Sequence, residues 1–324
     1  MRSRVVTDIP VVVEEVNPPS VHSVETRGVK LEYRTPNPVR AGAIRAARSD
    51  QRFQVSTWPV LGMVTPAKVL VVMGSPRKGN TYGAAERLRM LMEARGPVTF
   101  EYLWLRDAAL EQCRGCAACV GKGEEFCPNR DDVPGIVRAM HGADGIILAS
   151  PVFSWQVPGL LKVLIDRLSY TMHRPHLYGK KVLVLATAML GTKDVERYLV
   201  RVAQFWGAEV VATAGLITPP TVPARQRKKN ERVLATAAES FYRALQPERR
   251  TSPPLRSVLN FHGGRALVDE QKGETPVDYR YWKEHGWLDP GARYYTDSPV
   301  NPAYTAIGRI VEFVMRRAIR MDWM

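Results

Sequence analysis

The middle of the chain alternates short apolar runs with longer segments whose apolar residues recur at helical spacing. Each short run is continuous and rich in β-branched residues, like the run KVLVVM that starts at Lys68, which is typical of a strand buried on both faces. These runs predict five strands, at residues 68–73, 99–105, 145–153, 181–188 and 208–217. The other segments predict helices at residues 82–94, 131–142, 159–170, 194–206 and 230–245, the second capped by Asp131 and Asp132.

Five buried strands that alternate with helices predict an α/β domain with a parallel sheet covered on both faces, here at residues 67–250. Such domains bind ligands beyond the carboxyl ends of their strands. Residues 1–66 are an N-terminal extension, partly irregular, because several prolines break any helix there. Residues 251–324 are a C-terminal extension with an aromatic segment at 278–288, which we expect to pack on the body of the protein or on a neighbouring subunit. It also has an amphipathic helix at 304–321, expected to dock on the body or a second subunit through Ile307, Ile310, Val311, Val314 and Ile319.

Charge and composition narrow the range of partners. The 324 residues include 46 Lys and Arg against 32 Asp and Glu, a net charge of +14. The excess is concentrated around a basic run at residues 225–232, which lacks interleaved aromatic residues. We interpret this run as a solvated loop leading into a helix and expect no nucleic-acid partner. No apolar run reaches the ~18 residues of a membrane span, and Pro10, Glu14 and Glu15 interrupt the first apolar stretch, so we expect a cytoplasmic protein.

The turn after the first predicted strand, GSPRKGNT at residues 74–81, is rich in hydrogen-bond donors. Its spacing is close to that of a nucleotide-binding loop, but Asn80 stands where that loop needs a lysine for the terminal phosphates. The pattern G-x-G-x-x-G of dinucleotide sites is also absent from this turn. Because a helix begins directly after the turn, its free N–H groups face any anion bound there. The turn therefore predicts a site for a phosphate monoester without magnesium.

All four cysteines of the chain lie within 15 positions, at Cys113, Cys116, Cys119 and Cys127. Three thiols separated by two residues each, with a fourth further on, can surround a cubane iron–sulfur cluster. Zinc would favour two separated C-x2-C pairs, and here seven residues lie between the last two cysteines. Three alternatives follow: a [4Fe–4S] cluster, free or redox-active thiols, and a zinc site.

The loop G-S-P-R-x-G-N-T and the stretch SPVFSWQVPGLLKVLIDR at residues 150–167 resemble those of flavodoxin-like NAD(P)H-dependent FMN reductases. The resemblance implies a three-layer α/β/α sandwich with strand order 2-1-3-4-5 and FMN as cofactor. It places the FMN phosphate and ring against Ser75, Arg77, Lys78, Gly79, Asn80, Thr81, Pro151, Val152, Phe153, Ser154, Ala188 and Gly191. We interpret Lys162, Asp166 and Arg167 as a helix-surface ion pair and a buried anchor, without a catalytic role.

The cysteine motif resembles that of the iron–sulfur flavoproteins, a branch of the same family, and this implies a [4Fe–4S] cluster on Cys113, Cys116, Cys119 and Cys127. The aromatic segment is similar to one that follows the flavodoxin-like domain in some relatives. The implied protein is an FMN-dependent oxidoreductase that couples two-electron flavin chemistry to a one-electron carrier such as ferredoxin. The flavin carries the chemistry, so no catalytic side chain is assigned. NAD(P)H is a possible reductant, and the family implies a homo-oligomer, a dimer or a tetramer.

Two alternative functions stay open at this point. One is a cluster-free NAD(P)H-dependent FMN or quinone reductase. The other, of a different class, is a redox-sensing or electron-carrier protein without a substrate of its own.

Overall fold

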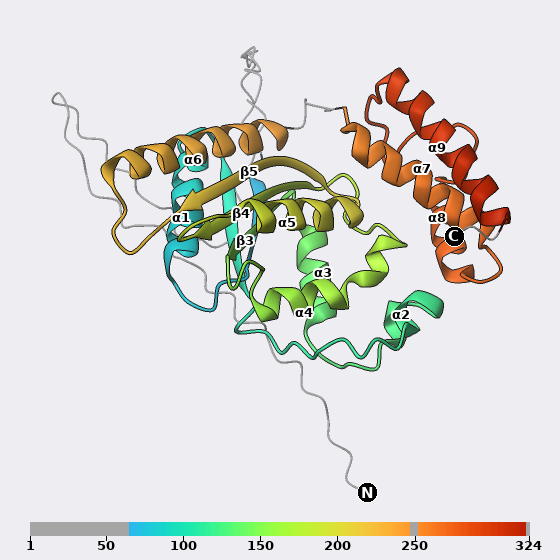
Figure 1. The fold of residues 1–324 in the computed structure, drawn as a ribbon, viewed down its shortest axis with the longest axis horizontal. Coiled ribbons are helices and arrows are strands. Elements are labelled where there is room, and N and C mark those ends of the chain that lie inside the picture. The colour runs from blue at the N-terminus through green and yellow to red at the C-terminus, as the bar shows by residue number, and fades with distance from the viewer. Residues whose placement is uncertain (1–64, 247–251, 322–324) are drawn as a thin grey trace, which may run out of the picture. The chain divides into compact units, whose positions relative to one another are not determined.

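The computed structural model describes residues 65–246 and 252–321. The N-terminal extension predicted at 1–66 lies almost wholly outside the described residues. A five-stranded sheet forms the centre of the fold (Figure 1). Its strands are all parallel and run in the order β2-β1-β3-β4-β5, which confirms the predicted topology. They are β1 Ala67–Met73, β2 Val98–Trp104, β3 Gly145–Pro151, β4 Lys181–Ala188 and β5 Glu209–Ile217.

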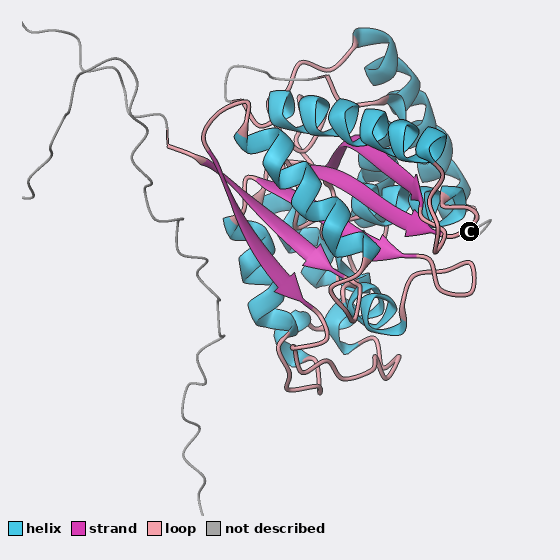
Figure 2. Ribbon diagram, turned by 90° about the vertical axis from the view of Figure 1, so that its left-hand side faces the viewer, coloured by secondary structure: helices cyan, strands magenta, loops and turns pink. Residues whose placement is uncertain are grey.

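Helices cover both faces of the sheet (Figure 2). One face packs against α1 (Asn80–Glu93) and α6 (Ala224–Ala244), through side chains such as Leu88 and Phe241. The other face packs against α3 (Val133–Gly142), α4 (Gly159–Arg167) and α5 (Lys193–Phe205). Alternate residues of β1 go to opposite faces, Val69 and Val71 to one core and Leu70 and Val72 to the other, because successive side chains of a strand point in opposite directions. The three-layer α/β/α architecture is thereby confirmed.

Two local interpretations from the sequence were wrong in detail. The basic run at 225–232 is exposed, but it lies inside α6, which begins at Ala224 rather than near residue 230. Arg, Lys and Gln are good helix formers, and Pro223 at the N-cap position favours a helix start directly after it. Asp132 occupies the N-cap position of α3 but does not cap it, since its carboxylate accepts the N–H of Ala109 at 2.7 Å. Asp131 instead accepts the N–H of Val133 at 3.3 Å.

The predicted helix 159–170 ends earlier, at Arg167, and a short 3-10 turn follows at Ser169–Met172. The described residues of the C-terminal extension form three helices, α7 (Leu255–Glu270), α8 (Pro276–Glu284) and α9 (Pro302–Arg320). Its own core is aromatic and includes Phe261, Trp282, Trp287, Tyr294 and Tyr295. The extension contacts the segment before β4, where the Trp282 indole donates to the carbonyl of His173 at 2.7 Å. No helix within the described residues is long and apolar enough to span a membrane.

Helix α9 packs on α7 with its polar side rather than through the predicted apolar residues, and docking of those residues on a second subunit stays a prediction. Glu312 accepts from the His262 ring at 2.8 Å, and Arg316 pairs with Asp269 at 2.5 Å. Gly308 allows this close approach, because a Cβ there would lie 2.2 Å from the His262 ring. The apolar side of α9 points away from α7 and leaves Ile307, Ile310, Phe313 and Val314 exposed.

Candidate functional site

The loop between β1 and α1 lies at the carboxyl ends of the strands and is held from several sides. Gly74 donates its N–H to the carbonyl of Ala149 on β3 at 2.8 Å, and a Cβ at Gly74 would lie only 2.9 Å from Leu161. Ser75 is buried, and its hydroxyl donates to the carbonyl of Arg77 at 2.8 Å. The lack of a side chain at Gly74 therefore lets the loop turn sharply over β3 and α4.

Two residues at the start of α1 connect this loop to the ends of β4 and β5. The hydroxyl groups of Thr81 and Thr187 are 2.7 Å apart, and Asn80 donates to the carbonyl of Thr218 at 3.3 Å. No side chain caps α1, whose N-cap residue is Gly79. The first-turn amide groups and the helix dipole therefore favour an anion in front of the helix.

Arg77 and Lys78 are exposed beside the uncapped start of α1. Within the part of the chain that the structure describes, neither pairs with a carboxylate, and the Lys78 ammonium lies 5.6 Å from the centre of the Tyr82 ring. Two cations, an uncapped helix N-terminus and the small residues Ser75 and Gly79 fit a phosphate group. The residues present are thus consistent with the flavin phosphate site implied by the sequence.

The loop after β3 holds its aromatic residues in an unusual backbone conformation. Phe153 and Gln156 exchange two backbone hydrogen bonds, at 2.8 and 2.9 Å, around a tight turn. Ser154 and Trp155 in this turn have φ angles of 46° and 65°, a left-handed conformation that is costly for residues other than glycine. Strained turns of this kind occur preferentially at functional sites.

The ends of β3 and β4 present apolar side chains to solvent. Phe153 is 47% exposed and Trp155 is 63% exposed. Trp155 lies next to Gly191 in the loop after β4, where a Cβ would be 3.9 Å from the Trp155 ring. Met189 and Leu190 of the same loop are also exposed. Since Val152 donates to the carbonyl of Thr187 at 2.9 Å, the two loops form one apolar rim, which suits a planar aromatic ligand.

Of the predicted flavin contacts, the structure places Pro151, Val152, Phe153 and Ser154 at the end of β3, and Ala188 and Gly191 at the end of β4. Those in the loop from Ser75 to Thr81 lie at the end of β1, whose strand is the neighbour of β3. Trp155 is absent from the predicted set. Its exposure and its left-handed backbone come from the fold of the turn, so a sequence pattern gave no signal for it.

The cysteine loop, residues 105–132, follows β2 at the edge of the sheet. Cys113 and Cys116 are exposed, whereas Cys119 and Cys127 are half-buried. Burial raises the pKa of the Cys119 thiol, and the nearby Cys127 and Cys113 raise it further. Among the described residues, no three Cys, His, Asp or Glu side chains converge closely enough to share a metal ion. The donor set suits an iron–sulfur cluster chemically, but the thiols are not gathered around one centre in this conformation.

A buried arginine, Arg167 at the end of α4, holds both ends of the cysteine loop. It donates to the carbonyl of Glu111 at 2.9 Å, to Asp131 and, at 3.6 Å, to the sulfur of Cys127. Burial alone would raise the pKa of Asp131, but the hydrogen bonds from Arg167 and from backbone N–H groups hold it below its usual value. The interpretation of Arg167 as a buried anchor therefore agrees with its contacts, as does the Lys162–Asp166 surface pair at 2.6 Å.

A second buried arginine, Arg174, contacts the middle of the same loop. It donates to the backbone carbonyls of Cys119 and Val120 and pairs with Glu124 at 3.0 Å. It also pairs with Asp278 of α8. Sequence reasoning missed both Arg174 and Asp278, because their contact spans more than 100 residues and no local pattern marks it.

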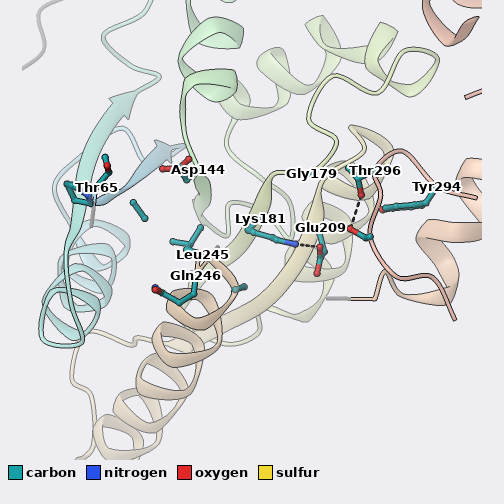
Figure 3. A pocket seen from close by; sticks show the side chains of 13 residues that line it. Thr65, Asp144, Gly179, Lys181, Glu209, Leu245, Gln246, Tyr294 and Thr296 are labelled. Atoms are coloured by element: carbon teal, nitrogen blue, oxygen red, sulfur yellow. Dashed lines mark hydrogen bonds and ion pairs between the residues drawn. The ribbon is translucent and has the colours of Figure 1, made fainter. Parts of the chain in front are cut away.

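A cavity beside the sheet does not belong to this site. It has a volume of about 580 Å³ and is lined by residues such as Ala67, Lys181 and Glu209, which begin β1, β4 and β5 (Figure 3). Lys181 and Glu209 form an ion pair at its wall. It therefore lies at the amino ends of the strands, opposite the loops described above.

The central domain is similar in sequence to known proteins. Residues 67–219 match the family model described as NADPH-dependent FMN reductase. An iron-sulfur flavoprotein of Archaeoglobus fulgidus is 31% identical over 230 residues, which are 68% of this chain and 100% of that protein. The iron-sulfur flavoprotein CD630_04720 of Clostridioides difficile is 34% identical over 232 residues, 67% of this chain and 98% of that protein.

Several further archaeal iron-sulfur flavoproteins match over only part of their length, between 48% and 65%. Among solved structures, RosB with a bound intermediate aligns with a TM-score of 0.45 at 15% identity, covering 55% of this chain and 79% of that one. The full-length matches at more than 30% identity decide the assignment: this chain belongs to the family of NADPH-dependent FMN reductases and iron–sulfur flavoproteins.

Proposed function

We propose that this oxidoreductase binds FMN at the carboxyl ends of β1, β3 and β4 and holds a [4Fe–4S] cluster on its four cysteines. The observation that supports the flavin site best is the uncapped N-terminus of α1 beside Arg77 and Lys78, which faces the same strand ends as the apolar rim of Phe153, Trp155 and Leu190. One part suits a phosphate and the other a planar ring.

Different side chains would bind the phosphate and the ring of FMN. Arg77, Lys78 and the first-turn amides of α1 would neutralise the phosphate, while Ser75 and Asn80 orient it. The turn at Ser154 and Trp155 would fix the position of the ring and keep water from one of its edges. When bound, FMN supplies hydride and single-electron transfer. No described side chain is assigned a proton in this chemistry.

The cysteine loop would supply the second redox centre. Cys113, Cys116, Cys119 and Cys127 are the ligands we propose, and a bound cluster would exchange one electron at a time. Arg167 supports this role because its guanidinium lies 3.6 Å from the Cys127 sulfur, and hydrogen bonds to ligand sulfurs tune such centres. Together the two centres would connect NAD(P)H to a one-electron carrier such as ferredoxin.

A cluster-free reductase of FMN or quinones is the second candidate. A quinone reductase of Escherichia coli is 28% identical over 151 residues of this chain. The exposure of Cys113 and Cys116 suits the free thiols that this candidate would have.

Anaerobic purification separates these functions. We expect the flavin released by denaturation to run as FMN in chromatography, with about four iron and four sulfide per chain. Cys116→Ala should remove the iron and leave the FMN, because the phosphate loop belongs to a different segment. Lys122→Ala, a change of an exposed residue in the same loop, should keep both cofactors.

The possible outcomes assign the function. FAD, or no flavin after reconstitution, would overturn the flavin site. FMN with no iron after anaerobic reconstitution would leave the cluster-free reductase. FMN and iron without any oxidation of NAD(P)H would favour an electron carrier.

A further inference from the structure

Arg174 joins three separate segments of the described chain at one buried point. Its side chain is 1% exposed, and it lies between the 3-10 turn at Ser169–Met172 and the start of β4. The guanidinium donates to the carbonyls of Cys119 and Val120, and it pairs with the carboxylates of Glu124 and Asp278. The planar fork of arginine allows these contacts at once.

Asp278 supplies the buried counter-charge. Its side chain is fully buried, and its second oxygen lies 3.1 Å from the Nδ1 atom of His173. Glu124, by contrast, is 38% exposed and can exchange its contact for water. A buried arginine that loses its main counter-ion is strongly unfavourable and tends to leave the interior. The contacts of Arg174 with the carbonyls of Cys119 and Val120 therefore depend on Asp278.

Besides its contacts with Arg174, the middle of the cysteine loop is attached by Cys119 and Val120, which pack against the core of the central domain, and by Glu124, which lies 3.4 Å from His176. Arg167 fixes the ends, at Glu111, Cys127 and Asp131. Between them, Cys113 and Cys116 are exposed, and Gly115 and Ala117 adopt positive φ angles. Helix α8, which carries Asp278, is itself secured to the body by hydrogen bonds from Tyr281 to Pro175 and from Trp282 to His173.

We infer that Asp278, acting through Arg174, is a positioning residue for Cys119. The C-terminal extension thereby supports the cysteine site. The extension lies outside the region that matches the reductase family model, residues 67–219. A flavodoxin-like domain without it would keep the four cysteines but lose the support of the loop's middle. The inference is tested in two ways, and only the measurement of iron release depends on the proposed function.

The test compares Asp278→Asn with wild type in two states of the full-length protein. In metal-free protein with reduced thiols, the rate of iodoacetamide labelling is followed for each cysteine by mass spectrometry. We expect Cys119 to react about 10- to 100-fold faster, by analogy with the loss of metal affinity when an outer-shell partner of a site is removed. Cys127, which Arg167 holds, should keep its wild-type rate. In iron-loaded protein, a chelator should remove iron faster by a similar factor.

Two further variants keep the result interpretable. Asp269→Asn breaks the pair with Arg316 between α7 and α9, at 2.5 Å. This variant should change neither the labelling rate of Cys119 nor the rate of iron removal. Arg174→Lys keeps a positive charge but loses the fork, so it should repeat the selective effect on Cys119 if Asp278→Asn does not fold.

The pattern over the cysteines decides the inference. Equal acceleration of Cys119 and Cys127 would indicate general loosening, and unchanged labelling of Cys119 would show that Asp278 has no positioning role; either result overturns the inference. Wild-type protein without iron would contradict the proposed cluster, but the labelling experiment would still test Asp278.

Discussion

Some ion pairs of this protein could be predicted from the local sequence, and others could not. The Lys162–Asp166 pair follows from a spacing of four residues on a helix. Arg174, His176 and Asp278 belong to a buried cluster whose members meet only through the tertiary fold. In the sequence they look like ordinary surface residues, because nothing in a window of 10 or so residues reports a partner about 100 positions away.

His176 gives a pH dependence at this scale. Burial lowers its pKa to about 4; Glu124, 3.4 Å from its Nε2 atom, opposes the shift, and His141 and Arg174 add to it. The unfolded chain binds this proton near pH 6.5. Between pH 6.5 and about 4 only the unfolded state is protonated, so the stabilising effect of neutral His176, complete above pH 6.5, is lost as the pH falls through this window.

We expect His176→Phe to remove this contribution. Between pH 7 and pH 5, the free energy of unfolding should fall by about 2 kcal/mol less in the variant than in wild type. This difference corresponds to ~1.4 kcal/mol for each pH unit below 6.5. Urea unfolding followed by far-UV circular dichroism at the two pH values measures the difference. An identical fall in both proteins would contradict the role of His176.

At the scale of elements, the strands and the helices of the central domain were largely predictable because buried parallel strands are continuous apolar runs. The extension was harder. Helix α7 was not predicted: its buried residues, among them Val258, His262 and Arg265, include polar ones and do not form a simple apolar stripe. Helix α9 was predicted, but the side that contacts α7 was not, because ion pairs of Glu312 and Arg316 make that contact together with Met315, which lies against Gly263.

The strand–loop–helix unit at β1 and α1 yields a prediction about FMN. Asn80→Ala should weaken FMN binding by about 1–3 kcal/mol, the value of a hydrogen bond to a charged partner. Asn230→Ala is a matched control, since Asn230 makes the same kind of bond, to the carbonyl of Ile217 at 2.8 Å, but from α6. Titration of the flavin-free proteins with FMN, followed by flavin fluorescence, compares them. Equal losses in both variants would assign the effect to the end of β5 instead.

For the molecule as a whole, the exposed side of α9 bears on assembly. Ile310 is 63% exposed, Phe313 67% and Val314 57%. The polar side of the same helix contacts α7. Contiguous apolar surface of this kind commonly marks a contact between proteins, and twofold dimers are the commonest homo-oligomers. We propose this face as a contact between copies of the chain.

Ile310→Glu should weaken such an assembly. Burying an unpaired carboxylate in an apolar contact costs about 3 kcal/mol or more, which corresponds to about 100-fold in the dissociation constant. Light scattering at micromolar concentration should therefore show a smaller particle than for wild type. Arg309→Glu, an exposed change on the flank of the same helix, should leave the size unchanged. A wild-type monomer at that concentration would disprove the assembly.

The contact between Arg174 and Asp278 also has a consequence for how the protein is made. Cys127 leaves the ribosome about 150 residues before Asp278, or roughly 8–30 s earlier at 5–20 residues per second. During that interval the nascent chain can form its parallel sheet, but the cysteine loop still lacks the partner of Arg174. Iron delivered to the growing chain would meet a loosely held loop. If the four cysteines hold the proposed cluster, its stable loading would be a late step, completed after α8 has been synthesised.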